Sequence, residues 1–322
     1  MSKYLVTGAA GFIASKVCEL LVADNHEVIG IDNLNDAYDV RLKHWRLEQL
    51  QGMPNFTFHE LDICDRDSLR ELFSSQVAAV INLAARAGVR QSIENPWDYF
   101  ETNVTGTLNL LELCKECDIK KFVLASTSSL YGASDLQPFR EDANTGKPLS
   151  PYAASKKGAE VLCHTYHYLY GIDMTVFRYF TVYGPAGRPD MSLFRFVQWI
   201  SEGRAVTIFG DGQQSRDFTY VDDIAKGTIQ GLKPLGYEII NLGSDKPVVL
   251  MDAIQRIEKL VGSKADLQFQ PRHPADVLAT WADISKAEKL LNWRPVHHFQ
   301  QGVESLFAWY QANQSWAKRI AT

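Results

Sequence analysis

Cysteine is scarce in this chain of 322 residues, which contains five. An odd number of cysteines in a chain of this length does not indicate a disulfide framework, so we expect reduced, structural thiols. His164 and His167 are spaced to share a helix face, but no nearby carboxylate or cysteine completes a metal site with them. The sequence therefore predicts no bound metal.

Long apolar runs and clusters of positive charge are also missing. The net charge is −5 without any run of Lys and Arg, which argues against a nucleic-acid partner. No apolar stretch approaches the roughly 20 residues that a membrane-crossing helix needs. Residues 3–8 already read as a strand, which leaves no room for a signal peptide. We therefore expect a cytoplasmic protein with no membrane partner.

The first half of the chain alternates short β-branched runs with longer amphipathic helical patterns. Such repeated β-α units predict a Rossmann-like, doubly wound parallel α/β sheet with helices on both faces. The pattern becomes irregular near residue 180. We expect residues 1–180 to form this domain, with part of 218–244 returning to it, and residues 181–322 to form mainly a smaller α/β substrate-binding domain. The expected strands are 4–8, 27–32, 56–63, 78–85, 121–127 and 174–184.

Three small residues lie in the turn between the first expected strand and the first expected helix. In VTGAAGFIA these are Gly8, Gly11 and Ala14, a GxxGxxA spacing. Small residues allow a pyrophosphate to approach the backbone, and a helix N-terminus favours its negative charge. The turn therefore predicts a dinucleotide site.

Asp32 ends the second expected strand, 21 residues beyond Gly11. A carboxylate there can accept both adenosine ribose hydroxyls and repels a 2′-phosphate, and no arginine follows until Arg41. NAD is thus favoured over NADP. Lys43 could also reach that ribose, and Asp62 and Ile63 are placed to contact adenine.

Tyr152 and Lys156 have YxxxK spacing after the helix-start signal Ser150-Pro151. Residues four apart lie on one helix face, so the ammonium can approach the phenol. A tyrosine of ordinary pKa, about 10, is a poor base at neutral pH. We expect the lysine and a positive nicotinamide ring to lower that pKa.

Over nearly its whole length the chain resembles the extended branch of the short-chain dehydrogenase/reductase superfamily. The matching motifs are TGAAGFIA, Asp32, NLAA at 82–85, Asn103, STSSLYG at 126–132, Tyr152-x-x-x-Lys156 and SRDFTYVDDIA. The resemblance implies that Thr127 bonds the reacting oxygen, that Tyr152 is the general acid/base and that Lys156 holds the nicotinamide ribose. The cofactor-binding residues that it implies, besides those named, are Phe12, Ile13, Asn33, Leu83, Ala84, Ala85, Asn103 and Phe180.

Two carboxylates are missing where related enzymes carry them. The family's 4,6-dehydratases read TDEVYG and its UDP-glucuronate decarboxylases typically read TSEVYG, whereas this chain has Ser128 and Ser129 at those positions. Dehydration needs an acid to protonate the leaving hydroxyl, so it is disfavoured. Epimerisation at the sugar C4 needs no such acid.

The segment YGPAGRPDM is similar to one in UDP-glucuronate 4-epimerases. The resemblance implies that Arg188 and Thr181 meet the uronate, and Ser128 and Ser129 are candidates to hold its carboxylate away from decarboxylation. It also implies a nucleotide site, in which either His273 or the adjacent Arg272 meets pyrophosphate. The other nucleotide-site residues are Thr207, Ile208, Phe209, Arg216 and Asp276.

The expected function is therefore epimerisation between UDP-glucuronate and UDP-galacturonate with tightly bound, recycled NAD. The alternatives are a UDP-galactose or UDP-pentose 4-epimerase, a UDP-glucuronate decarboxylase, and a non-enzymatic NAD-sensing protein on the same fold. Family members commonly pair through two helices per subunit, which implies a homodimer.

Overall fold

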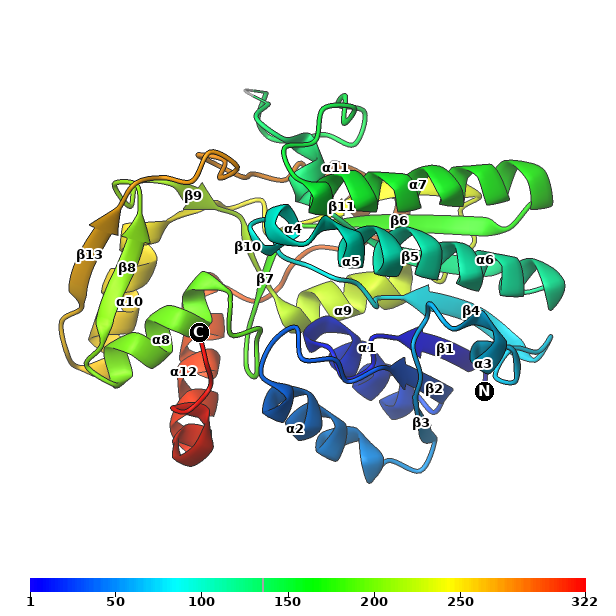
Figure 1. Ribbon diagram of the computed structural model, residues 1–322, viewed down its shortest axis with the longest axis horizontal. Helices are drawn as coiled ribbons and strands as arrows, with labels where there is room; N and C mark the ends of the chain where they lie inside the picture. Colours follow the sequence, from blue (N-terminus) through cyan, green and yellow to red (C-terminus); the bar gives the residue numbers. More distant parts are fainter. Residues whose placement is uncertain (135) are drawn as a thin grey trace.

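Seven parallel strands form the central sheet in the computed structural model, which describes residues 1–134 and 136–322. Their order is β11-β6-β5-β4-β1-β2-β3, and it reverses direction between β1 and β4. This is the doubly wound arrangement, which confirms the predicted fold class (Figure 1). The strands are β1 (Lys3–Thr7), β2 (Glu27–Asp32), β3 (Phe56–Glu60), β4 (Val77–Asn82), β5 (Lys121–Thr127), β6 (Asp173–Tyr179) and β11 (Tyr237–Leu242).

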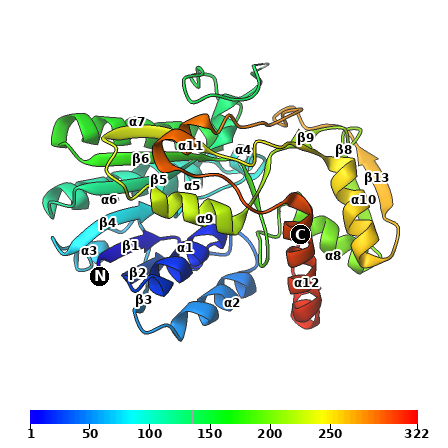
Figure 2. The ribbon, with the colours of Figure 1, turned by 180° about the vertical axis from the view of Figure 1, so that it is seen from behind.

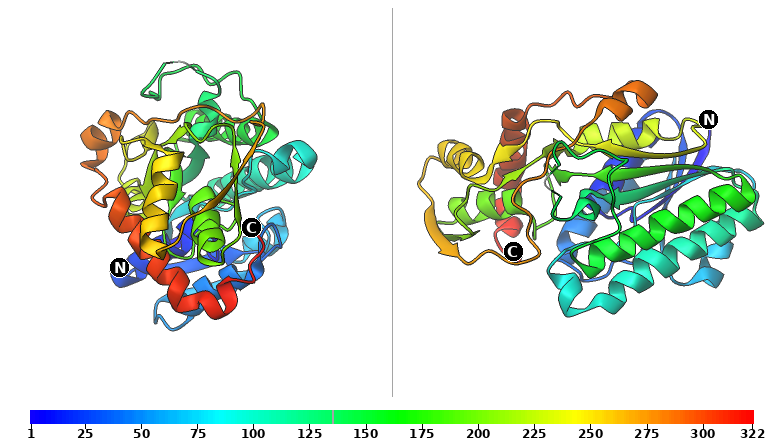
Figure 3. Two further views of the ribbon diagram at one scale, coloured as in Figure 1. Left: turned by 90° about the vertical axis from the view of Figure 1, so that its left-hand side faces the viewer. Right: turned by 90° about the horizontal axis from the view of Figure 1, so that it is seen from above.

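Helices cover both faces of this sheet, and each face has its own apolar core (Figure 3). The inner strands are buried on both sides, which explains their continuous apolar sequences; every residue of β5 is buried. On one face lie α1 (Phe12–Ala23), α2 (Val40–Gln51), α9 (Val221–Gln230) and α11 (Ser285–Leu291) (Figure 2). On the other lie α3 (Arg66–Arg70), α5 (Pro96–Phe100), the π-helix η1 (Glu101–Thr105), α6 (Gly106–Glu116) and α7 (Pro151–Tyr170).

A third apolar core lies in the C-terminal part of the chain, beside the sheet. Its elements are α8 (Ser192–Ser201), β8 (Ala205–Phe209), α10 (Leu250–Val261), β13 (Asp266–Gln270) and α12 (Phe299–Ala317). Short strand pairs connect the two parts: β7 (Thr181–Tyr183) with β10 (Phe218–Tyr220), and β9 (Ser215–Arg216) with β12 (Val248–Val249). β11 pairs with β6 in the large sheet. The domain limits at residue 180 stay a prediction.

Two further short helices, α4 (Gln91–Glu94) and the 3₁₀ helix η2 (Ser128–Tyr131), follow the ends of strands. Within residues 1–134 and 136–322, no helix has both the length and the apolar character to cross a bilayer. Nor do three or more His, Cys, Asp or Glu side chains of these residues gather in a way that could hold a metal ion.

Candidate active site

A cavity of about 590 Å³ opens at the carboxyl ends of the sheet strands and extends to the C-terminal part. Ligands bind at this edge in doubly wound sheets, at the point where the strand order reverses. Asn103, Ile208, Arg272 and His273 do not line the cavity, whereas all the other residues predicted to bind cofactor or substrate do. One cavity therefore contains both the predicted cofactor-binding residues and the predicted substrate-binding residues.

The glycine turn after β1 is tightly packed against the loop after β4. Gly8 has a φ of +72°, and a Cβ on it would lie 2.8 Å from the backbone nitrogen of Ala84. A Cβ on Gly11 would lie 2.7 Å from the Gly8 carbonyl oxygen. Both positions require glycine. The bare backbone at the start of α1 fits the diphosphate of a dinucleotide.

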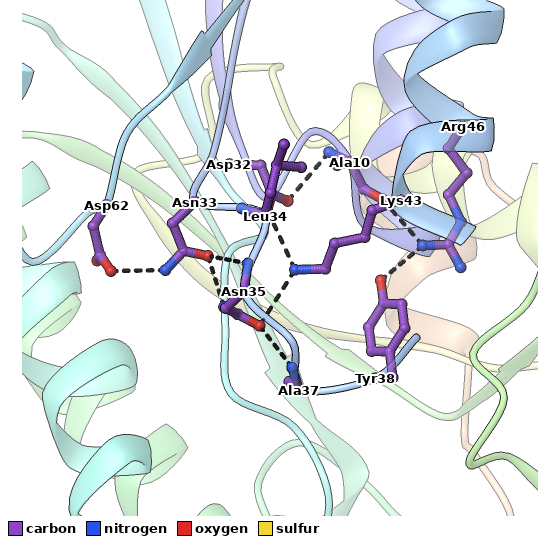
Figure 4. Close-up of polar contacts among 10 residues, drawn as sticks. All are labelled: Ala10, Asp32, Asn33, Leu34, Asn35, Ala37, Tyr38, Lys43, Arg46 and Asp62. Carbon is purple, nitrogen blue, oxygen red and sulfur yellow. Dashed lines mark hydrogen bonds and ion pairs between the residues drawn. The ribbon is translucent and has the colours of Figure 1, made fainter. Parts of the chain in front are cut away.

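Asp32 is fixed at the end of β2 by backbone donors. Its carboxylate accepts from the amides of Ala10 at 3.2 Å and Leu34 at 2.9 Å, and it pairs with Lys43 at 3.4 Å (Figure 4). Lys43 also donates to the Asn35 side chain at 3.3 Å. The lysine predicted to reach ribose is thus held against Asp32, the acid predicted to bind the same ribose.

Asp62, which is predicted to contact adenine, lines the cavity and accepts two hydrogen bonds. Asn33 donates to its carboxylate at 2.7 Å and the amide of Cys64 donates at 2.8 Å. Burial favours the neutral acid, but these donors outweigh burial and lower the pKa of Asp62. Asp62 therefore stays charged beside Asn33.

Asn103 lies on η1, behind the cavity wall. Its side-chain amide donates to the Arg86 carbonyl at 3.0 Å and to the Ser155 hydroxyl at 2.9 Å, and it accepts from the Arg86 amide at 3.0 Å. It therefore joins the loop after β4 to the helix that carries Tyr152. Its predicted direct contact with the cofactor stays a prediction.

The predicted reacting group comes from two adjacent elements. Thr127 ends β5, and its hydroxyl accepts from the Ser129 amide at 3.1 Å. Ser150 caps α7 by accepting from the Ala153 amide at 3.2 Å, which places Tyr152 in the first turn and Lys156 one turn later. Thr127, Tyr152 and Lys156 all line the cavity.

Burial controls the acidity of both α7 groups. It raises the pKa of Tyr152, although a hydrogen bond with Thr127 and the charge of Arg188 act in the opposite direction. Burial also lowers the pKa of Lys156 to about 8. Without a cofactor the pKa of Tyr152 is therefore raised, because the loss of hydration disfavours the phenolate more than its neighbours stabilise it. The lowering expected from a bound nicotinamide ring stays a prediction.

Hydroxyl groups surround the sugar end, where no carboxylate stands at positions 128 and 129. Ser128 and Ser129 begin η2, Thr181 begins β7, and all three line the cavity. Arg188 donates to Asp190 at 3.1 and 2.5 Å and to the Ala87 carbonyl at 3.0 Å. Burial opposes the charge of Arg188, but Asp190 raises its pKa, so the guanidinium stays protonated.

The nucleotide end contains a pairing that the sequence did not indicate. Arg90 pairs with Asp276 at 2.6 Å, and its guanidinium lies 3.9 Å from the centre of the Phe209 ring. Arg90, which directly precedes α4, thus contacts both Asp276, the predicted ribose-binding acid, and Phe209, whose ring is predicted to line the uracil site. Arg216 donates to the carbonyls of Ser215 and Leu278, and burial lowers its pKa.

Arg90, Asp190 and Arg195 line the cavity but were not predicted as site residues. Arg195 lies in α8, and its buried Nε has no hydrogen-bond partner among the described residues. No local pattern marked it, because Arg188 precedes α8 and the spacing of the two arginines therefore does not place them on one helix face. His273 instead accepts from the Ala275 amide at 3.1 Å, and its role at the pyrophosphate stays a prediction.

The doubly wound sheet, glycine turn, Asp32 and Thr-Tyr-Lys group define an extended short-chain dehydrogenase/reductase. Residues 4–243 match the NAD dependent epimerase/dehydratase family, and the chain belongs to that family. It is 57% identical to a UDP-glucuronate 4-epimerase of Thermodesulfobacterium geofontis over 322 residues, covering 99% of each chain.

Solved structures show the same similarity. One is UDP-glucuronic acid 4-epimerase from Bacillus cereus in complex with UDP-glucuronic acid and NAD; it is 38% identical with a TM-score of 0.90, covering 97% of this chain and 99% of that one. Another is a UDP-glucose 4-epimerase with UDP-glucose from Thermotoga maritima; it is 30% identical with a TM-score of 0.90, covering 97% and 99%.

Proposed function

We propose that the protein is a UDP-glucuronate 4-epimerase, which interconverts UDP-glucuronate and UDP-galacturonate with bound NAD. The observation that carries this proposal is the shared cavity, which Thr127, Tyr152 and Lys156 line together with Ser128 and Ser129, the serines that replace the carboxylates of the dehydratases and decarboxylases. Its similarity to the T. geofontis and B. cereus epimerases over nearly the whole chain supports it.

The cofactor would be held by the turn from Gly8 to Phe12 at its diphosphate, by Asp32 at one ribose and by Lys156 at the other. Bound NAD would supply the hydride acceptor for the sugar C4 and, after the 4-keto sugar has rotated in the cavity, the donor that returns the hydride to the opposite face. Tyr152 takes the proton of the 4-hydroxyl and later returns it. Thr127 bonds the same oxygen and helps to stabilise the phenolate.

A 4-keto uronate presents a hazard that a plain hexose does not. Its carboxylate is β to the ketone, and such acids lose CO₂ most easily when the C5–C6 bond aligns with the carbonyl π system. Donors from Ser128, Ser129 and Thr181 would hold the carboxylate out of that alignment, with Arg188 as the nearby cation.

At the nucleotide end, cations from separate elements would meet the diphosphate of the substrate. Arg216 and Arg195 line the cavity there, and Asp276 would accept from the uridine ribose. Thr207 and Phe209, both on β8, would contact uracil. His273 or the adjacent Arg272 would add a further contact with the pyrophosphate.

The test is to incubate the purified protein with UDP-glucuronate and follow the products by NMR. Formation of UDP-galacturonate supports the proposal. UDP-xylose or a 4-keto-pentose would instead identify a decarboxylase, and conversion of UDP-galactose or a UDP-pentose in preference to the uronate would identify a different epimerase. Bound NAD without turnover of any UDP-sugar would favour a sensing protein.

We also propose that the protein is a homodimer and that it works in the cytoplasm, where UDP-sugars and NAD are available. The dimer is supported by exposed apolar side chains on adjacent helices: Trp97 and Phe100 on α5, Leu108 on α6, and Val161 and Tyr168 on α7. These helices lie side by side on one face of the sheet (Figures 1 and 3).

A further inference from the structure

Arg46, on α2, is buried without a carboxylate partner. Its side chain is 2% exposed, and no carboxylate of the described residues lies within 4.0 Å of its guanidinium. Burying an unpaired charge is costly, so its retention calls for specific polar partners. All of its partners are neutral oxygens of two loops that line the active site and of the Tyr38 hydroxyl.

The five N–H groups of the guanidinium are all used. Nη1 donates to the Ala10 carbonyl at 3.0 Å and to the Tyr38 hydroxyl at 2.7 Å (Figure 4). Nε and Nη2 donate to the Ala186 carbonyl at 3.0 and 2.7 Å, and Nη2 also donates to the Gly187 carbonyl at 3.3 Å. A planar fork with every donor occupied has one orientation.

The two loops have different predicted tasks. Ala10 lies in the glycine turn that would hold the cofactor diphosphate, and its amide is bonded to Asp32 at 3.2 Å. Ala186 and Gly187 directly precede Arg188, the cation of the sugar end. Ala186 has a φ of +51°, a left-handed conformation that costs free energy in a non-glycine residue. The donors of Arg46 stabilise that turn through its carbonyl.

We propose that Arg46 is a positioning residue that joins the cofactor turn to the loop carrying Arg188, so that one guanidinium sets the geometry of both. The expected effect on UDP-glucuronate binding rests on the proposed function, whereas the expected effect on NAD binding rests on the fold alone. Arg46 does not line the cavity and its N–H groups are all occupied, so it does not contact the sugar itself. Its effect on the sugar acid is expected through the orientation of Arg188.

The first measurement is the affinity of the NAD-saturated protein for UDP-glucuronate and for UDP, by titration calorimetry in a Tyr152→Phe background that stops turnover. Loss of charge-assisted bonds to the Ala186 turn should weaken UDP-glucuronate binding by about tenfold in Arg46→Met. UDP lacks the sugar acid, so its affinity should be unchanged. Arg46→Lys should resemble Arg46→Met, since an ammonium cannot span both loops.

The second measurement is the NAD retained after gel filtration without substrate, which should fall in Arg46→Met because the Ala10 carbonyl loses its anchor. Arg41→Met is the matched control: Arg41 lies on the same helix but bonds Asp39 and the Arg319 carbonyl outside the cavity. It should retain NAD and uronate affinity. Thermal unfolding verifies that each variant is folded.

Ala186→Gly provides a rescue that a general loss of stability would not show. Glycine adopts a positive φ without strain, so Arg46→Met/Ala186→Gly should recover part of the UDP-glucuronate affinity without recovering NAD retention. Equal losses for UDP and UDP-glucuronate, wild-type behaviour of Arg46→Lys, no rescue, or an effect at only one loop would overturn the joining role. If the wild type does not convert UDP-glucuronate, the proposed function fails, whereas NAD retention still tests the anchor at Ala10.

Discussion

Tyr152 depends on its neighbours to lose its proton, because burial raises its pKa. Thr127 and Arg188 act in the opposite direction, and a bound oxidised nicotinamide would add a further positive charge. Lys156, whose pKa burial lowers to about 8, is near the midpoint of its own titration at mildly alkaline pH. The raised pKa of Tyr152 means that the phenol is protonated in the protein without cofactor.

Tyr152→Phe tests the acid/base role. It should retain NAD but lose turnover by about 10²–10⁴-fold, the range that a positioned general acid/base contributes. Epimerisation rates by NMR and the NAD content per protomer are the measurements. Tyr168→Phe, on the same helix but 80% exposed, is the control and should be fully active. Near-normal turnover of Tyr152→Phe would refute the assignment.

Ser128→Ala and Ser129→Ala test whether these hydroxyls hold the carboxylate of the uronate. Each removes a hydroxyl that would bond the carboxylate, so UDP-glucuronate affinity should fall by up to about tenfold and pentose product should increase. Calorimetry and NMR of the products measure the two effects, with Ser305→Ala on α12 as the control. Unchanged UDP-glucuronate affinity together with no added pentose product would mean that these hydroxyls do not hold the carboxylate.

At the scale of elements, a buried ion pair connects α7 to the sheet directly behind the reacting group. Glu160 lies one turn after Lys156 and is fully buried. It accepts from Arg178 of β6 at 3.0 and 2.9 Å and from Ser126 of β5 at 2.7 Å. Because Ser126 precedes Thr127, this carboxylate relates the helix that carries Tyr152 to the strand that carries the hydroxyl.

Glu160→Gln should lower both stability and turnover. Removing one partner of a buried pair costs about 3–5 kcal/mol, because the other charge is left uncompensated. Thermal unfolding and kcat are the measurements. Glu19→Gln, which loses only a surface pair with Lys16, should change stability by less than about 1 kcal/mol.

The double variant Glu160→Leu/Arg178→Met separates the two effects of this pair. Neutral, well-packed replacements should restore stability, since no buried charge remains unpaired. They should not restore kcat, because the anchor for Ser126 is still missing. Recovery of kcat together with stability would show that the pair is only structural.

The features that could be predicted from the sequence are those that depend on residues close together in the chain. The glycine turn, Asp32 and the Tyr152–Lys156 spacing are short patterns, and alternating strands and helices predict the sheet. The partner of Asp276 is Arg90, 186 residues away, and Arg46 reaches Ala186 over 140 residues. Such pairs are set by tertiary packing. The direction of the Tyr152 pKa likewise depends on burial, which no local pattern gives.

At the scale of the whole molecule, α5, α6 and α7 leave an apolar surface beside the active-site wall. Trp97 is 81% exposed and Tyr168 80%, values unusual for large aromatic rings outside an interface. Val161 and Tyr168 are seven residues apart on α7 and so lie on one face, which is turned away from the face that carries Lys156 and Glu160 into the interior by roughly a third of a helical turn. A second copy of the chain would cover this surface.

Val161→Glu should therefore dissociate the proposed dimer. A twofold interface buries the same patch of both subunits, so the substitution would bury two carboxylates without partners. Sedimentation velocity at micromolar concentration should show a dimer for the wild type and a monomer for the variant. Val296→Glu is the matched control: Val296 is 66% exposed but follows α11, away from this surface, and its variant should stay dimeric. A monomeric wild type, or a Val161→Glu variant that sediments as a dimer, would contradict the proposed interface.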